Sequence, residues 1–109
     1  MSLYGDYIRE RLGDEIVEDE TGFATYRFLN EKQVYIVDIY IVPEFRKKGA
    51  ATALADKVVE AAKQRGCMEL IGSVVPQAKG STDSLRVLLG YGMSLQSAGP
   101  DLILFRKEF

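Results

Sequence analysis

The chain has 109 residues, 47% of them hydrophobic and 28% charged, which is the composition of a globular protein with one domain, residues 1–109, and a modest core. Its formal net charge of -2 argues against a nucleic-acid partner. No apolar run is long enough to span a membrane, and the single cysteine, Cys67, allows no internal disulfide, so we expect a cytoplasmic protein with no membrane partner. Histidine is absent, so proton transfer must use a carboxylate, a tyrosine, a thiol or water.

The N-terminal part of the chain predicts a short helix followed by three strands. Apolar residues of the segment Leu3–Leu12 share one helical face, and Gly13 would end that helix. Strands are predicted at Glu15–Glu18, Phe23–Phe28 and Val34–Val42, and the turn residues between them favour an antiparallel meander. The third strand is apolar on both faces, so we expect it to be central in the sheet and covered on both sides.

The C-terminal part predicts a long helix, a strand, a short helix and a hairpin. An apolar stripe at helical spacing follows Gly49, and Gly66 stands at the position of a helix C-cap. The strand Glu69–Val75 would then run parallel to the third strand through a right-handed crossover. A loop, a helix to about Leu89 and a hairpin complete the chain, with the hairpin strands at 93–96 and 102–107. We predict an α/β (α+β) fold, a mixed and mostly antiparallel sheet with a parallel central pair and flanking helices.

The stretch between the third strand and the long helix carries the strongest functional signal. After Val42-Pro43 comes a basic turn in which Arg46, Gly49 and Ala51 have the spacing Arg-x-x-Gly-x-Ala. A glycine without a side chain, free helix N–H groups and the helix dipole together bind phosphate. An ordinary strand–turn–helix corner with a solvated basic face is the alternative.

The same spacing, in its strand and helix context, resembles the acetyl-CoA-binding signature of the GNAT superfamily of N-acetyltransferases. The order of elements after about residue 15 is similar to that fold as well. The resemblance implies a mixed sheet in which the two parallel strands splay apart and admit the pantetheine arm of acetyl-CoA, bound by main-chain groups of the central strand. It assigns the arm to Ile39, Ile41 and Val42. It assigns the pyrophosphate to the turn and first helical residues, Arg46, Lys47, Lys48, Gly49, Ala50, Ala51 and Thr52.

The catalytic groups are less clearly marked. A second family motif has a tyrosine that often protonates the departing thiolate, and Leu88 stands at that position here. Tyr91 is a candidate for the acid, with a core aromatic as the alternative. Asp38 is the only carboxylate inside the central strand and is a candidate base if burial raises its pKa, with an ion pair to a neighbouring lysine or arginine as the alternative. A water chain without any side-chain base is a third possibility, and no metal ligands are assigned.

The resemblance implies transfer of an acetyl group from acetyl-CoA to a primary amine of unknown identity. Two alternatives are a CoA-binding or structural domain that has lost catalysis, and an interaction module that binds no CoA. Family members usually carry one more strand and two helices at the start, so we expect an acceptor pocket that is more open or is completed by another subunit in a homodimer.

Overall fold

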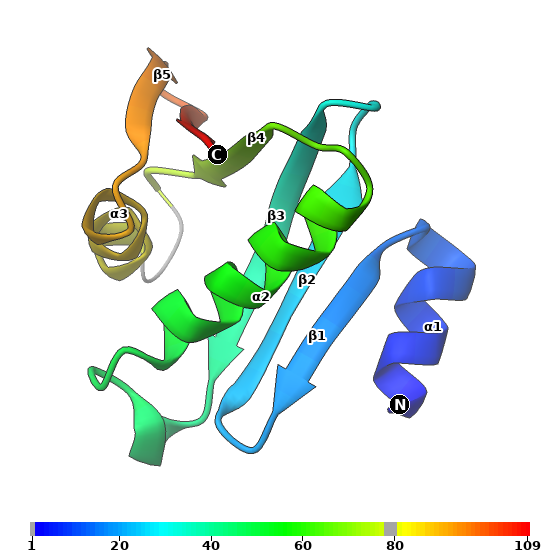
Figure 1. The fold of residues 1–109 in the computed structure, drawn as a ribbon. Coiled ribbons are helices and arrows are strands. Elements are labelled where there is room, and N and C mark those ends of the chain that lie inside the picture. The colour runs from blue at the N-terminus through cyan, green and yellow to red at the C-terminus, as the bar shows by residue number, and fades with distance from the viewer. Residues whose placement is uncertain (1, 78–80) are drawn as a thin grey trace.

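In the part of the chain that the structure describes, six strands form one mixed sheet in the order β1-β2-β3-β4-β6-β5, with three α-helices packed against it (Figure 1). The computed structural model describes residues 2–77 and 81–109, so most of the loop expected at 77–80 lies outside the described residues. The elements are α1 (Leu3–Leu12), β1 (Glu15–Asp19), β2 (Gly22–Phe28), β3 (Gln33–Ile41), the 3-10 turn η1 (Pro43–Phe45), α2 (Ala50–Gln64), β4 (Glu69–Val74), α3 (Ser81–Gly90), β5 (Ser94–Ala98) and β6 (Ile103–Glu108). The β3–β4 pair is parallel and the other pairs are antiparallel, which confirms the predicted fold class.

Helix α1 has both of its predicted ends and packs closely on β1. The Ser2 hydroxyl accepts a hydrogen bond from the Gly5 N–H at 2.9 Å, and Gly13 ends the helix in the left-handed conformation with φ 71°. Gly5 is required by packing, since a Cβ there would lie 2.9 Å from the Ile16 side chain. A residue that weakens a helix by propensity therefore allows this helix to approach the sheet.

The first three strands form the predicted meander, but β3 is not covered on both sides. A bulge at Val37 leaves Thr25 opposite Asp38 and Tyr26 opposite Ile36. Val37 and Tyr40 are 39% and 43% exposed, so the expectation of a strand buried on both faces is wrong. The run of apolar residues is explained by one face packed on the core and another that carries exposed apolar side chains.

Helix α2 lies across the sheet and closes the core, with the apolar stripe predicted from its sequence (Figure 1). Its buried residues are Leu54, Ala55, Val58, Val59 and Ala62. Beyond its last turn, Gly66 adopts φ 86° and the Cys67 N–H returns to the Ala62 carbonyl at 3.0 Å, which is the expected glycine C-cap. Cys67 itself is buried and free.

Helix α3 packs against β4 through a glycine. A Cβ at Gly72 would lie 3.1 Å from the Leu88 side chain and 3.3 Å from that of Met93, so a larger residue would require these side chains to shift by a few tenths of an ångström. The predicted C-terminal hairpin is present as β5 and β6, and β6 inserts between β4 and β5.

Candidate active site

The two parallel strands at the middle of the sheet separate after a short paired segment. β3 pairs with β4 only from Gln33 to Tyr35, opposite Glu69 to Ile71. β3 then continues to Ile41 and β4 to Val74, and the two strands diverge (Figure 1). The splay that the family resemblance implied is therefore present, and it leaves one edge of β3 unpaired inside the sheet.

The main-chain groups of Ile39 and Ile41 face this unpaired edge. The Val42 N–H donates to the Thr21 carbonyl at 2.8 Å, so Val42 points its N–H toward β2. Successive residues of a strand point their N–H and C=O groups to alternate edges, which turns those of Ile41 and Ile39 away from β2. Val42 differs from the expectation, because its N–H is held by Thr21 and its carbonyl accepts from the Phe45 N–H at 3.0 Å.

The loop after β3 forms an open cradle of backbone N–H groups at the start of α2. Lys47 and Gly49 have positive φ angles of 63° and 82°, and the N-cap Gly49 has no side chain with which to bind the first helical N–H groups. The first main-chain bond of the helix is from the Ala53 N–H to the Gly49 carbonyl. Three residues that the family resemblance assigns to the pyrophosphate precede Ala53 in the first turn: Ala50, Ala51 and Thr52. Their N–H groups and the positive end of the helix dipole are free to bind phosphate oxygens.

Space and charge at the cradle also suit a polyanion. A Cβ at Gly49 would meet no atom within 4 Å, so the loop backbone is open to solvent there. Lys47 and Lys48 are exposed beside it. Backbone donors thus come from a fixed loop, and two flexible ammonium groups can adjust to the ligand.

Arg46 has a different arrangement from its two neighbours. Its Nε donates to the Ile41 carbonyl at 2.8 Å, and its guanidinium lies 5.7 Å from the centre of the Tyr40 ring. Its own N–H donates to the Pro43 carbonyl at 3.3 Å. The side chain is therefore turned back onto the end of β3.

Asp38 lies on the face of the sheet opposite α2, on the same side as Tyr40. It is exposed, contrary to the expectation of a carboxylate buried inside a covered strand, because the bulge at Val37 and the open face leave it in solvent. Tyr4, Phe23 and Tyr40 line the same face, with ring centres 5.3 Å and 5.7 Å apart along the row. None of the ion pairs found among the described residues includes Asp38, so the alternative role as a paired carboxylate receives no support.

Tyr91 is half-buried and bridges the end of α3 to α2. Its hydroxyl donates to Asp56 Oδ1 at 2.6 Å, and the Lys107 ammonium lies 4.2 Å from its ring centre. Burial, and then the hydrogen bond to Asp56, raise the pKa of Tyr91, so the phenol stays protonated at neutral pH. Leu88 is 8% exposed and belongs to the core, while the side chains of residues 81–84, which include the other positions of that motif, lie outside the described part.

Sequence reasoning missed one element that braces the cradle. The β1–β2 turn abuts the end of β3, and Asp19 accepts from the Thr21 N–H at 2.7 Å and from the Thr21 hydroxyl at 2.5 Å. Lys57 of α2 donates to the other carboxylate oxygen of Asp19 at 3.0 Å. These hydrogen bonds, chiefly that of the Thr21 hydroxyl and then that of Lys57, lower the pKa of Asp19 to about 2. The turn itself was predicted from its residues, but nothing local in the sequence predicted its contact with α2.

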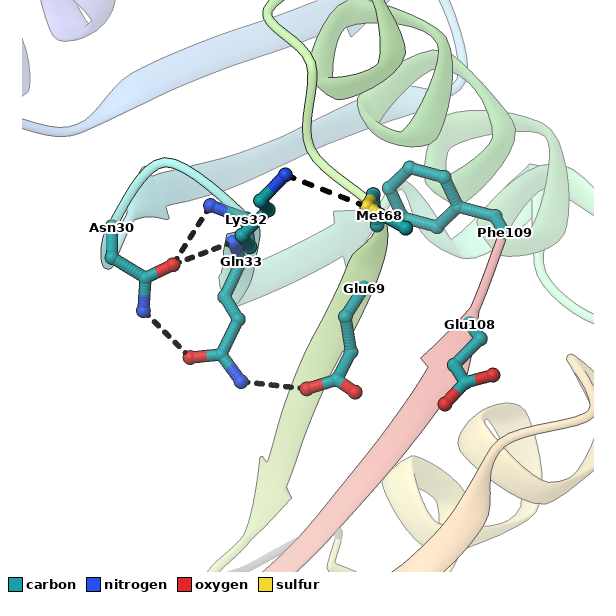
Figure 2. Close-up of a pocket in the computed structure, with 7 residues that line it drawn as sticks. All are labelled: Asn30, Lys32, Gln33, Met68, Glu69, Glu108 and Phe109. Carbon is teal, nitrogen blue, oxygen red and sulfur yellow. Dashed lines mark hydrogen bonds between the residues drawn. The ribbon is translucent and has the colours of Figure 1, made fainter.

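A separate depression of about 540 Å³ lies at the opposite end of β3, where β3 and β4 begin and β6 ends (Figure 2). Its lining residues are Asn30, Lys32, Gln33, Met68, Glu69, Glu108 and Phe109. Gln33 joins Asn30 to Glu69 by side-chain hydrogen bonds of 2.8 Å and 2.6 Å, so these polar groups of the depression already bind one another. The depression lies at the start of β3 and the cradle lies beyond its end, so the two are separated by roughly 25 Å of extended strand. We therefore place the candidate active site at the splay and the cradle.

Within the described residues, no helix has the length and apolar character needed to cross a membrane. The same residues contain no group of three or more acidic, cysteine or histidine side chains placed to hold a metal ion.

Comparison with curated proteins finds related sequences among acetyltransferases. The thialysine N-epsilon-acetyltransferase of Bos taurus is 30% identical over 66 residues, which is 61% of this chain and 39% of the bovine protein. The mouse protein of the same name is 35% identical over 52 residues, 44% of this chain and 31% of its own. The chain thus spans less than half the length of these relatives.

Solved structures extend the similarity to almost the whole fold. A putative acetyltransferase of the GNAT family from Desulfovibrio desulfuricans superposes with a TM-score of 0.77 at 21% identity, over 94% of this chain and 75% of its own. A GNAT family acetyltransferase from Elizabethkingia anophelis, solved with acetyl-CoA bound, gives 0.74 at 17% identity over 95% and 82%. At these identities the likeness establishes the fold. The model of the acetyltransferase (GNAT) family matches residues 10–91, well over half of the sequence, and the chain therefore belongs to that family.

Proposed function

We propose that this protein is an N-acetyltransferase that moves an acetyl group from acetyl-CoA to a primary amine by direct transfer. The observation that carries the proposal is the continuity of two features. The unpaired edge of β3 leads, at Ile41, into the open cradle of backbone N–H groups around Gly49. A ligand that combines an extended amide-bearing arm with a pyrophosphate fits that sequence of sites.

Each part of the co-substrate has residues suited to it. The N–H and carbonyl of Ile39 and the N–H of Ile41 would bind the amides of the pantetheine arm, much as an added strand would. The N–H groups of the cradle, with Lys47 and Lys48 beside them, would bind the pyrophosphate. Acetyl-CoA supplies the activated thioester, and the protein's contribution is alignment, charge stabilisation and a path for one proton.

Asp38 and Tyr91 are our candidates for proton transfer. Helices α2 and α3 and the core occupy one face of the sheet, so an amine would approach from the other face, on which Asp38 is exposed. A carboxylate there can accept the ammonium proton directly or through water. Tyr91 is the candidate donor to the thiolate from the sequence, but burial and the hydrogen bond to Asp56 raise its pKa, which makes it a weaker acid than a free phenol.

The acceptor is proposed only as a class. The relatives in cattle and mouse are named for thialysine, a compound with a primary amine on a flexible side chain. An aliphatic amine of that kind is compatible with the exposed carboxylate and the row of aromatic rings on the open face, since aromatic faces attract cations. Cytoplasmic location and a homodimer remain proposals that rest on the sequence.

A catalytically silent CoA-binding domain is the second candidate, favoured by Leu88, which has no acidic proton and is buried in the core. Two measurements separate the candidates. Thermal unfolding with acetyl-CoA, with ATP as the polyanion control, reports binding, since ligand at a hundred times its Kd adds about 2.7 kcal/mol. Radiolabelled acetyl transfer to a panel of amines reports catalysis. Stabilisation by acetyl-CoA alone with transfer supports the enzyme, stabilisation without transfer supports the silent domain, and no stabilisation refutes both.

A further inference from the structure

The Ile41 carbonyl is the last main-chain acceptor on the unpaired edge of β3, and Arg46 occupies it. The bond from Arg46 Nε is 2.8 Å long. The same peptide group is held at its other end, because the Val42 N–H donates to the Thr21 carbonyl at 2.8 Å. The peptide between Ile41 and Val42 is therefore held on both sides, because its N–H and one lone pair of its carbonyl oxygen are already bonded.

This bond determines which groups of the edge remain available. The Ile39 N–H, the Ile39 carbonyl and the Ile41 N–H face the gap between the strands, and beyond them the edge is closed. Equivalent groups on a strand edge recur every two residues, roughly 6.6 Å apart. An extended ligand that pairs with such an edge can in principle bind in more than one register, because the main-chain groups are chemically the same at each repeat.

Contacts of the guanidinium favour a fixed position over a mobile phosphate-binding side chain. The Arg46 backbone is anchored by its bond to the Pro43 carbonyl within η1, and the side chain lies against the Tyr40 ring. Lys47 and Lys48, by contrast, have no ion pair or hydrogen bond of their side chains among the described contacts. The three cations of the loop are thus divided into one that is bound to the strand and two that are free to meet a ligand.

We propose that Arg46 is a positioning residue that closes the free edge of β3 and thereby fixes the register in which the arm of acetyl-CoA binds. The inference rests on the proposed use of acetyl-CoA. With the Ile41 carbonyl occupied, the arm has one set of partners and the thioester has one position along β3. Without Arg46, the Ile41 carbonyl becomes a further acceptor, and the arm can also bind one repeat farther along the strand, where the thioester is out of place.

The test compares Arg46→Met, which keeps the aliphatic stem but has no donor, with Arg46→Gln, which has no charge but keeps an N–H that can reach a nearby carbonyl. Lys48→Met is the matched control, since it removes a charge from the same loop without touching β3. We would measure kcat at saturating acetyl-CoA, the Kd for adenosine 3′,5′-bisphosphate, and the backbone amide NMR signals of Ile39 and Ile41 with CoA bound.

In Arg46→Met we expect kcat to fall at least tenfold while the Kd for the bisphosphate changes less than twofold, and the amide signals of the CoA complex to split into two sets. Arg46→Gln should restore at least half of the lost kcat and a single set of signals. Lys48→Met should weaken binding of the bisphosphate and leave one set of signals. If the wild type binds CoA but shows no turnover, the number of NMR signal sets in each variant tests the role of Arg46 without kcat.

Two results would overturn the inference while leaving the proposed function intact. One is a loss of bisphosphate affinity in Arg46→Met that matches the loss in Lys48→Met, which makes Arg46 a phosphate ligand. The other is a CoA complex of Arg46→Met with a single set of amide signals and unchanged kcat. A wild-type protein that binds no CoA would instead refute the proposed function, and the inference with it.

Discussion

Replacement of Gly49 by alanine should separate the cost of backbone strain from the loss of ligand binding. Gly49 has φ 82°, and an added Cβ would meet no atom within 4 Å, so the variant suffers strain without a clash. Gly66 is a close control at the other end of α2, with φ 86° and equally open space. An alanine in the left-handed region costs about 1–2 kcal/mol, so each variant should lose a similar free energy of unfolding and roughly 4–8 °C in Tm per kcal/mol.

The response to CoA should then differ between the two variants. Ligand at a hundred times its Kd stabilises the native state by about 2.7 kcal/mol, and a tenfold loss of affinity lowers that gain to about 1.4 kcal/mol. We expect Gly66→Ala to keep the full gain and Gly49→Ala to lose at least half of it, because its methyl group would lie where we propose that the pyrophosphate meets the loop. Thermal unfolding with and without CoA, by circular dichroism, measures both quantities.

Equal stabilisation of the two variants by CoA would refute the placement of the pyrophosphate at Gly49. Without ligand, the two variants should lose the same free energy of unfolding, which shows that Gly66→Ala is a matched control for the backbone strain. A Gly49→Ala protein that loses much more stability than Gly66→Ala without ligand would indicate contacts at Gly49 that the backbone geometry does not contain.

Three further predictions concern side-chain contacts described by the structure. Arg27 Nε and Nη2 donate to the two carboxylate oxygens of Asp14 at 2.5 Å and 3.1 Å. Arg27→Met should lower the free energy of unfolding by about 3–5 kcal/mol, because it leaves a carboxylate that is 1% exposed without its partner, and Asp14→Asn should lower it less, because a lone Arg27, already half-exposed, can be hydrated; similar losses in urea unfolding would contradict this. Asp19→Asn should lower the free energy of unfolding at pH 7. The difference from wild type should shrink as the pH falls from about 4 toward 2, because a carboxylate with a lowered pKa stabilises the native state fully above its unfolded pKa and loses this effect as it is protonated; a difference that is constant with pH would contradict the pairing. Tyr91→Phe should lose less stability than wild type as the pH rises from 9 to 11. Burial and then the bond to Asp56 raise the pKa of Tyr91, so its stabilising contribution is complete below the unfolded pKa of about 10 and is lost as the pH rises above it; stability curves that run parallel would contradict the raised pKa.

The sequence predicted well those features whose cause is local. The stripe of α2, its glycine end at Gly66 and the turn around Gly49 depend on neighbours within one or two helical turns, and the structure has them in place. The central parallel pair followed from the handedness of a strand–helix–strand connection.

Features that depend on distant partners were not predictable in the same way. The bulge at Val37 is a property of the pairing between β2 and β3, and it decides that Asp38 is exposed. The bond from Tyr91 to Asp56 joins residues 35 positions apart, one just after α3 and the other on α2, and no local pattern specifies how these two segments meet. The orientation of Arg46 belongs to this group too. The motif predicts that Arg46 lies in the loop, but not that its side chain binds the Ile41 carbonyl at the end of β3.

The early end of the β3–β4 ladder has a further consequence, for protection of the backbone against solvent. Amides of central strands are usually the slowest in a protein to exchange with solvent deuterium. Here the Ile39 and Ile41 N–H groups belong to the third of six strands in spatial order, yet they have no ladder partner on their open side. The empty protein should therefore exchange these two amides quickly between well-protected neighbours. A bound ligand that pairs with them would slow both, so that the middle of the sheet is complete only when the site is filled.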